Sequence, residues 1–146
     1  MEKRTIVIGS DHAAIEMKNF LIEALKTDGY FIKDMGTDST EAVDYPDIAH
    51  PLAQLISEKS AELGILICGT GIGMSIAANQ HEWVRAAVCR NKETAGLARE
   101  HNDANIICLP GRFIDEDLAH EMVIIFLSSK FEWGRHATRV DKISNF

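Results

Sequence analysis

Cys68 directly precedes a glycine-rich loop in the stretch ILICGTGIG, residues 65–73. A cysteine thiolate can act as a nucleophile or abstract a proton, and the N-terminus of a following helix favours the thiolate. Glycines expose backbone N–H groups in a turn, and these groups suit a resident phosphate or an oxyanion that forms during a reaction. The stretch therefore indicates chemistry at Cys68. The alternative is a small buried side chain that ends a strand.

The glycine spacing of this loop excludes two familiar nucleotide sites. A dinucleotide fingerprint needs a third glycine where this chain has Met74, so the spacing here is G-x-G-x-G. The loop is not a P-loop either, because no G-K-[ST] follows it.

The other cysteines and the histidines are weaker candidates. Cys89 and Cys108 lie in apolar runs, where we expect buried thiols, and three cysteines without zinc-type spacing argue against a disulfide framework. His12 follows the first predicted strand, which suits a ligand contact. His101 ends a predicted helix, where a histidine is more often a cap than a catalyst.

A basic segment near the C-terminus is a candidate phosphate site. Arg135 and Arg139 are four residues apart, so they share one face of a helix. With His136 adjacent and Arg112 at a strand end, these side chains predict a phosphate clamp. The alternative is a solvated basic face.

Composition limits the class of protein. The chain has 146 residues, 46% hydrophobic and 25% charged, and a net charge of −7, which argues against general nucleic-acid binding. No apolar run approaches the roughly 20 residues that span a bilayer, so we expect no membrane segment. The N-terminal apolar run is short and is interpreted as a strand, which predicts a cytoplasmic protein.

Short β-rich runs alternate with longer amphipathic segments. Strands are expected at residues 4–9, 30–36, 63–69, 84–89 and 105–111. Helices are expected at about 12–27, 46–60, 72–79, 91–100, 115–127 and in the C-terminal segment 132–146. This order predicts an α/β fold: one Rossmann-like three-layer α/β/α domain, residues 1–146, with a five-stranded parallel sheet and a C-terminal helical extension.

In such a sheet, ligands bind beyond the carboxyl ends of the strands. Asp11 and His12 follow the first predicted strand, Cys68 ends the third, and Arg112 follows the fifth. Tyr45 lies in the loop after the second. These polar side chains are therefore expected to meet at one edge.

Several motifs together resemble ribose-5-phosphate isomerase B, of the sugar-phosphate isomerase family that also includes galactose-6-phosphate isomerase subunits. They run from residue 9 to residue 143 and read GSDHAAIEMK, DYPDIA, ICGTGIGMSIAAN, RAAVC, REHNDANIICLPGR and FEWGRHATRVDKI. The resemblance implies interconversion of ribose 5-phosphate and ribulose 5-phosphate, a step of the pentose phosphate pathway, without a metal or other cofactor.

The resemblance also implies residue roles. Cys68 matches the base that moves a proton between C2 and C1, His101 matches the residue that opens the furanose ring, and Thr70 assists. The loop of residues 69–73 would stabilise the enediolate oxygen. The substrate-binding positions that the resemblance implies are Asp11, His12, Tyr45, Gly69, Thr70, Gly71, Ile72, Gly73, Asn102, Arg112, Arg135, His136 and Arg139.

In the resembled family the site forms at a homodimer interface, so we expect a homodimer, with dimers that can pair into tetramers. Trp133 replaces a glycine that is often seen there. It stands beside the predicted phosphate clamp and could change the preferred sugar length. The alternatives are a preference for a six-carbon phosphate such as allose 6-phosphate, a non-catalytic sugar-phosphate-binding module, and a thiol redox role for Cys68.

Overall fold

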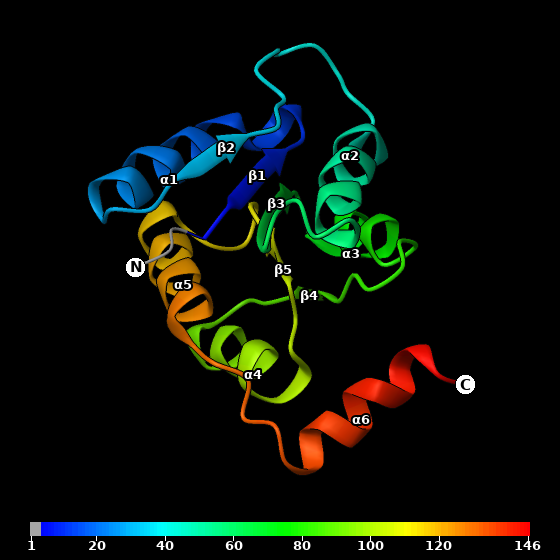
Figure 1. The fold of residues 1–146 in the computed structure, drawn as a ribbon. Coiled ribbons are helices and arrows are strands. Elements are labelled where there is room, and N and C mark those ends of the chain that lie inside the picture. Colours follow the sequence, from blue (N-terminus) through cyan, green and yellow to red (C-terminus); the bar gives the residue numbers. More distant parts are fainter. Residues whose placement is uncertain (1–3) are drawn as a thin grey trace.

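A five-stranded parallel sheet forms the centre of the computed structural model, which describes residues 4–146. The predicted α/β fold is therefore confirmed. The strand order is β2-β1-β3-β5-β4 (Figure 1). The strands are β1 (Ile6–Ser10), β2 (Ile32–Asp34), β3 (Leu63–Cys68), β4 (Ala86–Val88) and β5 (Ile106–Pro110).

Helices cover both faces of the sheet. One face packs against α1, α4 and α5, and the other packs against α2 and α3 (Figure 1). The helical elements are η1 (His12–Ala14), α1 (Ile15–Thr27), α2 (Tyr45–Ser57), α3 (Ile72–Ala78), α4 (Lys92–Asn102), α5 (Glu116–Ser128) and α6 (Arg135–Ser144).

The central strands are apolar almost throughout because both faces of the sheet are buried. Successive side chains point to opposite faces, so Ile65 and Ile67 join the core beneath α1 and α5. Leu66 and Cys68 join the core beneath α2 and α3. This alternation places the Cys68 side chain on the face from which α3 starts.

The two edge strands are shorter than predicted. The predicted second strand, residues 30–36, is reduced to Ile32–Asp34, and the predicted fourth, residues 84–89, is reduced to Ala86–Val88. Each of these strands pairs on one side only, so fewer backbone groups are held in the ladder.

The crossover helices determine which residues share an edge of the sheet. A helix between parallel strands returns the chain from the carboxyl edge to the amino edge. The end of α4 therefore lies at the amino edge. Helix α5, which follows β5, likewise returns the chain to the amino edge before α6 begins. Beyond it, α6 projects from the rest of the chain, and its packing is against α4 (Figure 1).

None of the helices in residues 4–146 has the length and apolar character needed to cross a membrane.

Candidate active site

The loop after β3 is built to present backbone N–H groups. Gly71 has φ +76°, and a Cβ there would lie 3.3 Å from the carbonyl oxygen of Cys108, so only glycine fits without strain. The Thr70 hydroxyl accepts a hydrogen bond from the Ile72 N–H at 3.2 Å. Within residues 4–146, no acceptor reaches the backbone N–H groups of Gly69, Thr70, Gly71 and Gly73. The loop can therefore bind a negatively charged oxygen.

Cys68 stands at the start of this loop as a free thiol that is 6% exposed. The other two cysteines differ in their surroundings. Burial raises the pKa of Cys89 to about 11 and raises that of Cys108 well above its ordinary value. Their predicted role as buried thiols is confirmed, and Cys68 alone of the three directly precedes the loop in the chain.

Two of the predicted binding side chains lie directly over the glycines. A Cβ on Gly73 would come within 2.6 Å of the Tyr45 ring, and a Cβ on Gly69 would come within 3.2 Å of Arg112 Nε. The absence of a Cβ at these two positions allows the close approach of Tyr45 and Arg112. An aromatic ring and a guanidinium thus flank the N–H groups of the loop.

Asp11 and His12 adjoin the loop from the neighbouring strand. The Asp11 N–H donates to the Ile67 carbonyl at 3.0 Å, and the Asp11 carboxylate accepts from the Ala13 N–H at 3.1 Å. The Val43 N–H donates to His12 Nδ1 at 3.0 Å, so neutral His12 carries its proton on Nε2. The structure therefore brings both predicted residues to the edge where Cys68 lies.

Sequence reasoning missed a residue that holds this region in place. Lys18 on α1 is fully buried, and its Nζ contacts Asp34 at 2.8 Å and Asp38 at 2.9 Å. The Asp34 carboxylate also accepts from the Gly36 N–H. Lys18 thus fixes the start of the loop whose far end supplies Val43 to His12. The signal in the sequence was a lysine at the apolar spacing of α1.

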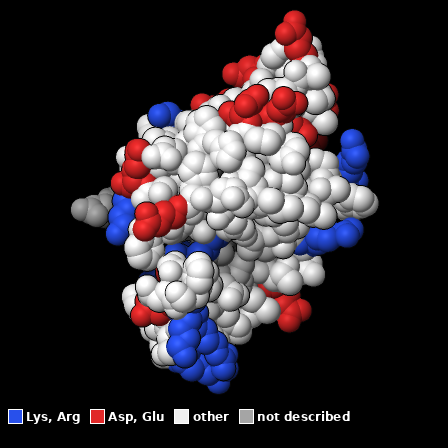
Figure 2. All heavy atoms as spheres, turned by 90° about the vertical axis from the view of Figure 1, so that its right-hand side faces the viewer, with Lys and Arg blue, Asp and Glu red and all other residues white. Residues whose placement is uncertain are grey.

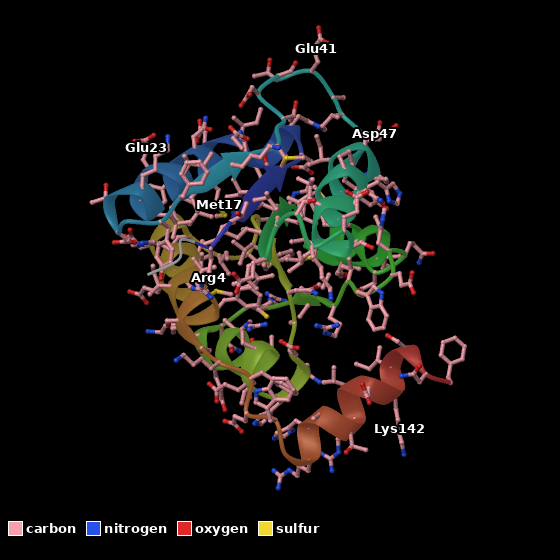
Figure 3. The ribbon with its side chains drawn as sticks, in the orientation of Figure 1. Arg4, Met17, Glu23, Glu41, Asp47 and Lys142 are labelled. Carbon is pink, nitrogen blue, oxygen red and sulfur yellow. The ribbon has the colours of Figure 1, made fainter. Side chains whose placement is uncertain are left out.

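A cavity of about 600 Å³ adjoins the loop on its other side. Cys68, Gly69 and Arg112 line it. Met17, which is labelled on α1 in Figure 3, also lines it. Its remaining charged lining consists of four carboxylates, from Glu16, Asp115, Glu116 and Asp117. Four negative charges disfavour a phosphate in this cavity.

A second cluster forms at the amino edge of the sheet. The His101 and His136 rings stack with centroids 4.2 Å apart and planes 11° apart. One Glu132 oxygen, Oε1, lies 3.6 Å from the Nε2 atom of each ring. Burial lowers the pKa of His136, and so do the charges of neighbouring cationic groups, whereas Glu132 raises it. Sequence reasoning found both histidines but missed Glu132, which precedes His136 by four residues.

These three side chains lie close enough together to suggest a metal site, but the ring geometry argues against one. The lone pair of an imidazole nitrogen points outward in the plane of its ring, and metals bind along that direction. Two rings that are nearly parallel and stacked do not direct their lone pairs to one point between them. The cluster is better suited to holding and moving a proton.

In one chain the predicted site residues form two separate groups. Gly64 pairs with Ile106 and Cys68 pairs with Pro110, so the amino edge of β5 lies roughly 13 Å from Cys68 along the strand, at about 3.3 Å per residue. His101 lies beyond that edge, at the end of α4.

Within one chain, the structure does not bring Arg112 together with Arg135 and Arg139, so the predicted clamp stays a prediction for two chains. Arg112 lies over Gly69 at the carboxyl edge, whereas Arg135 and Arg139 belong to α6. The physical reason is that α5 returns the chain to the amino edge before α6 begins. The group at the carboxyl edge comprises Asp11, His12, Tyr45, residues 68–73 and Arg112, and the other comprises His101, Asn102, Arg135, His136 and Arg139.

Comparison with known proteins adds an independent observation. The family model described as Ribose/Galactose Isomerase matches residues 6–143. A crystal structure of a ribose 5-phosphate isomerase from Thermotoga maritima is 48% identical, with a TM-score of 0.95 over 99% of this chain and 100% of that one.

Two further relatives bear on the ligand. Ribose-5-phosphate isomerase B from Mycoplasma genitalium, solved with bound ribulose-5-phosphate, is 41% identical, with a TM-score of 0.94 over 98% of this chain and 95% of that one. A D-erythrulose-4-phosphate isomerase of Pectobacterium atrosepticum is 41% identical over 97% of this chain and 94% of its own length.

Proposed function

The chain belongs to the ribose/galactose isomerase family, and on that premise we propose that it interconverts ribose 5-phosphate and ribulose 5-phosphate through an enediolate. The observation that carries the proposal is the position of Cys68 directly before a loop in which four N–H groups meet no acceptor from residues 4–146. A proton-abstracting group beside an oxyanion site is what aldose–ketose isomerisation needs.

The reaction begins with ring opening. His101 takes the proton from O1, the bond between C1 and O4 breaks, and a proton is returned to O4, with the Thr70 hydroxyl assisting. Cys68 as thiolate then removes the proton from C2, and the electron pair forms the C1–C2 double bond. The charge that develops on O1 is held by the backbone N–H groups of the 69–73 loop other than that of Ile72, which donates to Thr70. Transfer of the O2 proton to O1 and return of the proton from Cys68 to C1 give the ketose.

The two separate groups of side chains support a homodimer with shared sites. Cys68 needs a ring-opening histidine, and His101 of the same chain lies at the opposite edge of the sheet. In a dimer the partner subunit's His101 would face Cys68. The partner subunit's Arg135 and the partner subunit's Arg139 would then bind the phosphate, opposite Arg112. Two chains together complete two sites.

Surface character supports the same assembly. Figure 2 shows a wide face without charged side chains between an acidic region at the level of the 35–44 loop and a basic region at the level of α6. On α3, Ile72 and Ile76 are 53% and 60% exposed. Large apolar side chains exposed beside a candidate site are typical of a surface that a partner covers.

The length of the sugar is the finer part of the proposal. We infer a five-carbon substrate from the ribulose-5-phosphate that the Mycoplasma genitalium relative binds. The Pectobacterium relative, named for a four-carbon sugar phosphate, favours erythrulose 4-phosphate as a second candidate. A six-carbon phosphate such as allose 6-phosphate is a third. Rates on all three, measured side by side, rank them.

The test of the function is ketose formation from ribose 5-phosphate, with a chelator present, by wild type and Cys68→Ala. We expect metal-independent activity that the substitution abolishes, while the variant still binds ribose 5-phosphate. An inactive wild type would contradict the pentose assignment. A fully active variant would contradict Cys68 as the base. Rapid peroxide-driven disulfide formation at Cys68 in an inactive wild type would favour the redox role instead.

A further inference from the structure

Glu132 lies where it can act on the ring-opening histidine. Its N–H donates to the carbonyl of Glu100 at 3.0 Å, which ties it to the end of α4 beside His101. Its carboxylate lies 3.6 Å from His101 Nε2 and from His136 Nε2 and remains half exposed. The backbone is thus anchored, and the side chain can close onto either ring by a small movement.

The charges around this cluster favour a carboxylate in this position. Arg135 and Arg139 both contribute positive charge near the stacked rings. When His101 takes the O1 proton in the proposed reaction it becomes an imidazolium, a third positive charge in the same place. A carboxylate against Nε2 offsets that charge and fixes which nitrogen carries the proton.

We propose that Glu132 is a positioning residue for His101, which it holds with the proton on Nε2 so that Nδ1 faces the sugar. The inference rests on the proposed function and deepens it. Glu132 does not touch the reacting atoms and acts through the imidazole. The structural alternative is that Glu132 only anchors the start of α6 through His136, four residues later.

A comparison of two reactions separates these roles. Ribulose 5-phosphate carries its phosphate on O5 and therefore cannot close a furanose ring. Exchange of its C1 proton with deuterium from D2O needs Cys68 and the oxyanion loop, but no ring opening. Ketose formation from ribose 5-phosphate needs both. A defect confined to His101 therefore slows ketose formation from ribose 5-phosphate and leaves C1 exchange in ribulose 5-phosphate unchanged.

The experiment uses full-length Glu132→Gln and Glu132→Ala, with Glu23→Gln as the matched control. Glu23 lies on the outer side of α1, far from the cluster (Figure 3). We expect Glu132→Ala to lower kcat for ketose formation about 10- to 100-fold with KM little changed. Glu132→Gln, which keeps an acceptor without the charge, should lose less. C1 exchange should stay within about twofold of wild type in both, since neither variant alters Cys68 or its loop.

Other outcomes overturn the inference. Equal loss of ketose formation and C1 exchange would show that Glu132 supports the structure of the whole site and does not act on His101 alone. Unchanged ketose formation in both variants would show that Glu132 takes no part in ring opening. Failure of the proposed function looks different, because wild type would then catalyse neither ketose formation nor C1 exchange.

Discussion

Cys68 and His101 lie at opposite edges of the same parallel sheet, one at the end of β3 and the other at the end of α4. The proposed base and the proposed ring-opening group are therefore too far apart to serve one sugar within one chain. The distance follows from topology, because every crossover helix returns the chain to the amino edge. The homodimer that we propose would let both residues act at one shared site.

Gly71→Ala should damage the site more than an equivalent change elsewhere. The added Cβ would meet the Cys108 carbonyl at 3.3 Å, in a backbone with φ +76°, so the loop must shift. We expect a cost of about 1–3 kcal/mol in the free energy of unfolding and a fall in kcat. Urea unfolding and ketose formation measure the two effects.

The control for this change is Gly29→Ala. Gly29 has φ +93°, but a Cβ there meets nothing within 4 Å. It should lose stability from backbone strain alone and keep its kcat. If both variants lose kcat equally, the loop geometry is not what matters.

Lys18→Met should loosen the loop that carries Val43 to His12. Methionine fills a similar space but breaks the contacts with Asp34 and Asp38. We expect a loss of about 1–3 kcal/mol in the free energy of unfolding, because charged hydrogen bonds are removed. KM should rise more than kcat falls. Lys26→Met, at an exposed position of the same helix, should change neither. An unchanged KM in Lys18→Met would show that these ion pairs do not contribute to substrate binding.

The titration of His136 should respond to its neighbours with defined signs. Burial lowers its pKa, and His101, Arg135 and Arg139 lower it further. Arg139→Gln should therefore raise the pKa of His136, since it removes a charge that disfavours the imidazolium. Glu132→Gln should lower it. NMR titration of the ring protons measures both, and shifts in the reverse directions would contradict the described cluster.

The same lowered pKa has a consequence for stability. The folded chain favours neutral His136, so the unfolded chain takes up the proton first as the pH falls below about 6.5. His136 should therefore contribute less stability as the pH falls through that range. Urea midpoints of wild type should fall more steeply between pH 7 and pH 5 than those of His136→Phe. Parallel curves would show that His136 titrates alike in both states.

Part of this site could be predicted from sequence because strand ends are local features. Cys68, the glycine loop, Asp11 and Arg112 follow apolar runs directly, and the carboxyl ends of parallel strands share one edge. The burial of Lys18 could also be predicted from its spacing in the sequence. It follows Ile15 by three residues and precedes Ile22 by four, which is the stripe that faces the core.

Glu132 could not be found in this way. Its place beside His101 depends on a backbone hydrogen bond to Glu100 and on the stacking of the His101 and His136 rings. Contacts between elements far apart in sequence depend on packing and leave no local pattern. The backbone conformation of Trp133 could not be found from sequence either. Its φ is +62°, which glycine adopts without strain, and this explains why the resembled family often has glycine at this position.

The most direct test of a site shared between two chains mixes two inactive variants. Cys68→Ala and His101→Ala should each form little ketose from ribose 5-phosphate. In a dimer that contains one subunit of each, one site has neither residue and the other has both. Random mixing after reversible dissociation should then restore about a quarter of wild-type activity, since half the dimers are mixed and each has one intact site. A mixture that stays as inactive as its components would contradict a site shared between two chains.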